Sequence, residues 1–166
     1  MSCPGRIASE TPGEYRKLGP VPMSRVVQST EVLIPAHIAY RQWTDFESFP
    51  AFMYGVDSVA PLDATSHRWA IRIGGVSRTF DSQITEQKPD ERVAWRSVSA
   101  DVRHSGVVTL EHVDDSTTRV TTEIEWEPND LVERAAVAAG VVDYQIGVDL
   151  CRFKSFVELG PHRTWP

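Results

Sequence analysis

The chain has 166 residues, of which 41% are hydrophobic and 24% are charged, a composition typical of one globular domain. Its formal net charge of −6 disfavours nucleic acid and anionic membrane surfaces as partners, and no apolar stretch approaches the roughly 18 residues of a membrane-spanning helix. The only cysteines, Cys3 and Cys151, do not indicate a structural disulfide, so we expect a cytoplasmic protein without stable membrane insertion.

The first part of the chain differs in composition from the rest. Residues 1–24 contain four prolines and three glycines and show no sustained periodicity, which predicts a flexible N-terminal arm. We therefore place the folded domain at residues 25–160 and a short C-terminal tail at residues 161–166.

The domain is predicted to begin with a strand and two short helices. Residues 25–34 alternate as a strand does, and Pro35 suits the first position of a helix over residues 35–43. Asp45 is a candidate N-cap for the second helix. Five more strands follow, separated by turns such as Gly74-Gly75, at residues 66–73, 76–87, 92–98, 104–113 and 117–128.

The last predicted element is an amphipathic helix from Asn129 to about Leu159, which Gly140 and Gly147 can bend or interrupt. The predicted strands have one apolar face and one charged face. Burial then requires the helix to cover the apolar face, which gives an α+β domain with one wet side of its sheet.

Four segments resemble the polyketide cyclase/dehydrase branch of the START-like (SRPBCC, Bet v 1-like) superfamily. The most specific parts are D-x-E-x-x-P at Asp45, Glu47 and Pro50, and D-L-x-R-F-K from Asp149 to Lys154. The resemblance implies the helix-grip fold: a curved antiparallel sheet of about seven strands wrapped around a long C-terminal helix, with two short helices after the first strand. It also implies a hydrophobic cavity between sheet and helix.

The candidate cavity residues share the inward parity of the predicted strands or lie on helices expected to face them. Ordinary core packing explains many of the same positions, notably the aromatic residues of the second short helix. The set comprises Phe49, Phe52, Met53, Trp69, Ile71, Phe80, Ser82, Ile84, Trp95, Ser97, Val108, Thr122, Ile124, Trp126, Val142, Gln145 and Phe153.

Three residues are candidates for catalysis if the protein is an enzyme. Arg78 shares the inward parity and can hold an anionic oxygen, although a solvated hairpin tip is the simpler interpretation. His104 can act as acid or base, or can simply hydrogen-bond to the backbone. Asp149 falls on the apolar stripe of the helix, where it needs a partner such as Arg78 or backbone N–H groups.

The sequence leaves three functions open. We prefer a binding protein for a hydrophobic or amphiphilic small molecule, such as a lipid, quinone or polyketide. A polyketide cyclase/dehydrase is the alternative, but aromatase/cyclases of this superfamily use an inward arginine deep on the strand where Ser82 and Ile84 stand here. The third possible function is that of a protein-interaction module. The sequence also leaves open whether the protein forms a homodimer.

No cofactor and no metal are expected, because the chain lacks the usual metal, phosphate and nucleophile motifs. His104 and His112 lie eight positions apart on one predicted strand, roughly 26 Å, which is too far to share a metal ion.

Overall fold

The computed structural model of the protein describes residues 23–159, apart from residues 74, 99–102, 129–133, 136, 137 and 139. The predicted C-terminal tail and all but the last two residues of the predicted arm lie outside the described residues. The first strand already begins at Ser24.

One seven-stranded sheet forms the frame, and every neighbouring pair of strands is antiparallel. The order is β1-β7-β6-β5-β4-β3-β2, so the chain meanders from β2 to β7 and the first strand closes onto the last. The strands are β1 (Ser24–Val32), β2 (Val56–Pro61), β3 (Ser66–Ile73), β4 (Val76–Lys88), β5 (Arg92–Ser97), β6 (His104–Asp114) and β7 (Thr117–Trp126).

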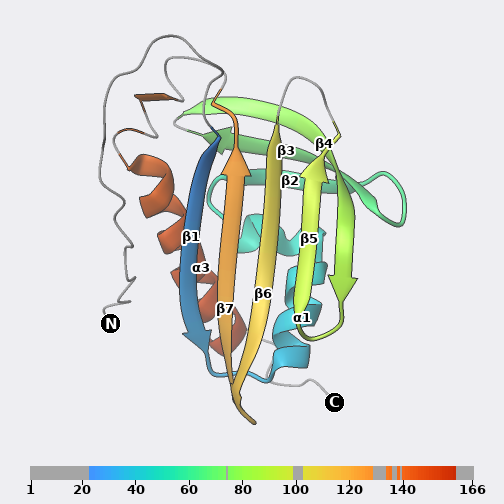
Figure 1. Cartoon of the computed structure of the whole chain (residues 1–166), viewed down its shortest axis with the longest axis vertical. Coiled ribbons are helices and arrows are strands. Elements are labelled where there is room, and N and C mark those ends of the chain that lie inside the picture. The colour runs from blue at the N-terminus through green and yellow to red at the C-terminus, as the bar shows by residue number, and fades with distance from the viewer. Residues whose placement is uncertain are drawn as a thin grey trace.

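The sheet is strongly curved. Figure 1 shows β4 crossing one end of the sheet beside β3 and then turning to run alongside β5. The pairing of β4 with β5 has an irregularity between Ile84 and Glu86, at which an extra residue lets the strand bend. This curvature gives the sheet a concave inner face.

The edge strand β2 is the one that sequence alternation did not identify. Only Val59 is buried in this strand, so its pattern carries no inward row of apolar side chains. Pro61 ends the strand at the edge of the sheet, where a missing N–H does not interrupt pairing. The resemblance anticipated seven strands, whereas the alternation alone identified six.

Two short helices follow β1, as expected: α1 (Ala36–Thr44) and the 3-10 helix η1 (Phe46–Ala51). Pro35 occupies the N-cap of α1 rather than its first helical position. Asp45 precedes η1, but its side chain makes no capping hydrogen bond, so this part of the prediction was wrong. Its backbone carbonyl accepts hydrogen bonds from the N–H (3.1 Å) and the hydroxyl (2.7 Å) of Ser48 instead.

The C-terminal helix α3 runs over Val141–Leu159, so it begins directly after Gly140, one of the two glycines at which the sequence predicted a bend or an interruption. Gly140 has φ of +69°, a left-handed conformation that ends regular helix geometry and that glycine adopts without strain. Ala135 and Ala138, which lie within the predicted helix, are exposed. Gly147 causes no interruption.

The helices of the described residues lie on one side of the sheet, with α3 along β1 and α1 across β5, β6 and β7 (Figure 1). Their aromatic side chains form the centre of the core. The Trp43 ring lies 5.5 Å from Phe49, 5.8 Å from Phe52 and 4.8 Å from Phe153, measured between centroids. Helices α1, η1 and α3 are therefore joined through one aromatic cluster over the concave face.

The opposite face of the sheet is charged and wet, as predicted. Arg119 pairs with Glu31 (2.8 Å) and Glu111 (3.3 Å), and Arg25 pairs with Glu123 (2.7 Å) across neighbouring strands. These side chains are well exposed, so each ion pair contributes little to stability.

Candidate functional site

The inward face of the sheet carries most of the candidate residues, at the positions that strand parity predicted. Phe80, Trp69 and Trp95 form a stacked aromatic row across β4, β3 and β5, with 6.0 Å between neighbouring ring centroids. The other members on strands are buried or half-buried on the same face: Ile71, Ser82, Ile84, Ser97, Val108, Thr122, Ile124 and Trp126.

The candidates on the helices differ in their environment. Phe49 and Phe52 are completely buried, and the Phe49 ring also lies 5.5 Å from Trp69 on the sheet. They fill the core and do not form an exposed wall. Met53 is half-buried, as are Val142 and Gln145 near the start of α3, whereas Phe153 belongs to the aromatic cluster.

Several buried polar atoms on the inner face have no hydrogen-bond partner among the described residues. They include the indole Nε1 of Trp95 and of Trp126, Nδ1 of His104 and Oγ1 of Thr122. Trp69 provides the contrast, because its Nε1 donates a hydrogen bond of 2.8 Å to the hydroxyl of Ser82. Buried polar groups are almost always paired in folded proteins, so such a concentration is unusual.

Trp43 Nε1 and His67 Nδ1 are also buried without a partner in the described part of the chain. They lie elsewhere in the core. Trp43 stands on α1 inside the aromatic cluster, and the His67 ring packs 4.7 Å from Phe46 of η1. Neither is a neighbour of His104 in the sheet register.

Trp95, His104 and Trp126 are near one another in the register around Gly106, and we call these three residues the indole–histidine cluster. Gly106 is opposite Trp95 in the pairing of β5 with β6, and a Cβ atom on it would lie 2.2 Å from Cζ2 of that indole. The Trp95 ring therefore lies directly on the Gly106 backbone. His104 is the next inward residue of β6, and it pairs with Trp126 of β7.

Sequence reasoning did not single out Gly106. The available signal was a glycine inside an otherwise regular strand pattern, "HSGVVTL", which often marks a close approach of another group to the backbone. Its role becomes visible only when the neighbouring strand is placed, because the indole that occupies the space comes from β5.

His104 is held in a largely apolar environment. Its ring centroid lies 5.1 Å from that of Phe80, and its backbone N–H donates to the hydroxyl of Ser97 at 3.0 Å. Burial lowers the pKa of His104 to about 4, so its imidazole is neutral near pH 7. Because Nδ1 has no partner in the described chain, the expected side-chain hydrogen bond to the backbone is not formed by this nitrogen.

Arg78 lies at the hairpin end of the inner face. It pairs with Ile71 of β3 and stands two residues before Phe80, which fits its predicted parity. The residue is half-buried, and its Nη1 donates to the carbonyl of Ser77 at 3.3 Å. Its position thus combines features of both sequence interpretations, the inward register and the hairpin tip.

Asp149 links α3 to the segment between η1 and β2 through a hydrogen bond. Its Oδ1 accepts a 2.8 Å hydrogen bond from the backbone N–H of Tyr54, one of the two kinds of partner expected. Burial raises its pKa to about 6, opposed by backbone hydrogen bonds from Tyr54 and Gly55 and by the charge of Arg152. The Gln145 amide packs against Gly55, where a Cβ atom would lie 2.1 Å from its Nε2.

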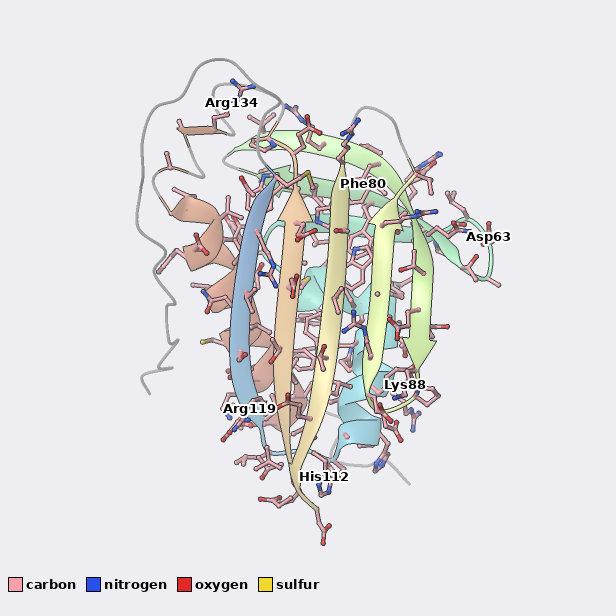
Figure 2. All side chains as sticks on the ribbon, in the orientation of Figure 1. Asp63, Phe80, Lys88, His112, Arg119 and Arg134 are labelled. Carbon is pink, nitrogen blue, oxygen red and sulfur yellow. The ribbon has the colours of Figure 1, made fainter. Side chains whose placement is uncertain are left out.

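Within the described residues, no group of three or more histidine, cysteine or acidic side chains is arranged to hold a metal ion. His112 lies at the end of the sheet opposite Phe80 (Figure 2), whereas His104 contacts Phe80, so these two histidines are well separated. None of the described helices is both long and apolar enough to cross a membrane.

The fold is shared with solved structures of the START-like class. A START superfamily protein from Mycobacterium smegmatis is 14% identical with a TM-score of 0.66, covering 81% of this chain and 97% of that chain. The Zhui aromatase/cyclase from Streptomyces sp. R1128 is 17% identical with a TM-score of 0.70, covering 82% of this chain and 94% of that one. The protein thus has the helix-grip fold that its sequence predicted.

The sequence comparisons identify the family more narrowly. Residues 32–145 match the family described as "Polyketide cyclase / dehydrase and lipid transport", and the chain belongs to this family. A relative from Streptomyces lincolnensis, described as an uncharacterized 17.2 kDa protein in the melC2-rnhH intergenic region, is 43% identical over 136 residues. This alignment covers 82% of the present chain and 91% of the relative.

Proposed function

We propose that the protein binds a hydrophobic or amphiphilic small molecule, of the lipid, quinone or polyketide class, between the concave face of its sheet and α3. The observation that carries the proposal is the composition of the inner face: broad aromatic surface with isolated buried polar atoms that the described residues leave unpaired. The family, whose description includes lipid transport, supports the same function.

The affinity of such a site would come mainly from burial of apolar surface, at roughly 25 cal/mol per Å², and orientation from a few polar groups. The unpaired atoms of the indole–histidine cluster are closed off from solvent. A ligand therefore reaches them only when neighbouring side chains move aside, so we expect binding to be accompanied by repacking of the inner face.

Polyketide cyclisation or dehydration is the second candidate. It is favoured by the position of Arg78 and His104 at one end of the inner face. Arg78 precedes Phe80 by two residues on β4, and the His104 ring contacts the Phe80 ring. Arg78 would stabilise an enolate oxygen, and His104 would accept a proton. The low pKa of His104 makes it a weak base and leaves it without a proton to donate as an imidazolium near pH 7.

Native mass spectrometry of the freshly purified full-length protein tests the binding function. We expect a second population with added mass, which disappears on denaturation and yields a lipid, quinone or polyketide on organic extraction. The control is a sample stripped with organic solvent and refolded, whose thermal midpoint should rise when the extract is returned. If no mass is added and no apolar compound moves the midpoint, the proposed function is wrong.

A further inference from the structure

We infer that the site selects an uncharged ligand carrying a hydrogen-bond-accepting oxygen, such as a ketone or quinone carbonyl, over a carboxylic acid and over a plain hydrocarbon. This inference rests on the proposed function and specifies the ligand chemistry of the same site. It follows from the indole–histidine cluster and from the distribution of charge around it.

The indole–histidine cluster contains two hydrogen-bond donors without an acceptor in the described structure. An indole Nε1–H can only donate, and those of Trp95 and Trp126 are buried with no acceptor among the described residues. The two side chains are only 3% and 4% exposed, so bulk solvent does not reach them. A hydrocarbon would leave both donors unpaired, whereas a carbonyl oxygen can accept from them.

The register places Trp95 and Trp126 on either side of one stretch of β6. Trp126 and His104 are direct cross-strand partners, which separates their Cβ atoms by about 5 Å. The Trp95 indole lies on Gly106, two residues from His104 and therefore about 7 Å along the same face. A ligand that lies along this stretch of β6 can therefore place a carbonyl oxygen at either indole.

The surrounding charge disfavours an acid. Among the described residues, Asp149 is the only buried charged side chain, and it is acidic. A carboxylate ligand at the indole–histidine cluster would therefore meet no buried cation. His104 provides no positive charge near pH 7, because burial holds its pKa near 4. Arg78 is half-buried at the hairpin end and already donates to the Ser77 carbonyl. Burying an unpaired carboxylate is costly, so a neutral oxygen fits better.

Three probes that share one ring skeleton test this selectivity: fluorenone, fluorene and fluorene carboxylate. Equilibrium dialysis against the full chain at pH 7.5 should give a dissociation constant for fluorenone at least about tenfold below that of fluorene. Fluorene carboxylate should bind more weakly than either. Fluorene has the same rings without the carbonyl, so the comparison isolates the oxygen acceptor.

Trp126→Phe removes one donor while it keeps an aromatic ring, and Trp95→Phe does the same on β5. Each change should reduce the preference for fluorenone over fluorene at least threefold. Trp43→Phe is the matched control, since it removes a buried indole N–H outside the cluster and should leave the preference unchanged. A thermal melt of each variant verifies that it is folded before dialysis.

The outcomes separate the inference from the function on which it rests. If fluorene binds as tightly as fluorenone, or if the carboxylate binds best, the inference is overturned while hydrophobic binding stands. The inference also fails if Trp43→Phe reduces the preference as much as Trp126→Phe does. If none of the three probes binds, the inference is overturned, and the proposed function fails with it only if native mass spectrometry also shows no added mass.

Discussion

Replacing Phe49 with alanine should lower the free energy of unfolding by about 3–5 kcal/mol, the usual cost of deleting a fully buried phenylalanine ring. Phe49 is 0% exposed, and its ring lies 5.5 Å from Trp43, 5.2 Å from Phe46 and 5.3 Å from Phe52. The cavity left by the change would be lined by rigid rings on η1, α1 and β3. These rings belong to separate elements. They can fill the cavity only if they give up contacts with their other neighbours.

Urea denaturation followed by circular dichroism measures this effect. Tyr54→Ala is the matched control from the same aromatic segment, because the Tyr54 ring is 69% exposed and loses little on truncation. A loss below about 1 kcal/mol for Phe49→Ala would show that the segment is a movable lining rather than part of the core.

Acidification from pH 6.5 to pH 4 should destabilise the wild-type protein by about 3 kcal/mol more than a His104→Gln variant. Burial lowers the pKa of His104 from 6.5 to about 4, so the unfolded chain binds a proton more readily than the native protein does. The contribution of neutral His104 is therefore fully present above the unfolded pKa of 6.5. It is lost as the pH falls through the folded value.

The comparison with the variant is necessary because carboxylates titrate over the same range. Asp149 contributes with the opposite sign: burial raises its pKa to about 6, so its stabilising contribution is present below the unfolded pKa and is lost as the pH rises through the folded value. His112→Gln is the control, an exposed histidine on the same strand. Parallel stability curves for the wild type and His104→Gln between pH 6.5 and 4 would contradict the buried, neutral state of His104.

The sheet was predictable wherever one face of a strand is buried and the other is wet. On β7, Val120, Thr122, Ile124 and Trp126 alternate with exposed or half-exposed residues, and the pairing follows that alternation. The pattern failed on β2 because an edge strand with a single buried residue has no alternation to detect.

The start of α3 was not predictable from periodicity. A 3.6-residue pattern continues through Gly140 in the sequence, but whether a glycine stays helical or adopts positive φ depends on where the chain must turn to meet the sheet. Gly147 stayed helical in the same helix, so composition alone does not distinguish the two positions.

The sequence predicted which side chains of the candidate site face inward, but it did not predict which of them hydrogen-bond to one another. Alternation placed Ser82 and Thr122 inward, and both are buried. It did not reveal that the Ser82 hydroxyl is taken by Trp69 while Thr122 and the indole of Trp95 are left without partners in the described structure. Such hydrogen bonds depend on contacts between strands, so the sequence of one strand does not predict them.

The most direct test of the account uses the five tryptophan indole N–H signals in a ¹H–¹⁵N correlation spectrum. Tryptophan-to-phenylalanine variants assign the signals one by one. On saturation with fluorenone, the signals of Trp95 and Trp126 should move downfield, because their N–H groups gain an acceptor, while that of Trp69 should stay bonded to Ser82 and unmoved. Downfield shifts confined to Trp43 or Trp69, or no shift at saturation, would contradict ligand binding at the indole–histidine cluster.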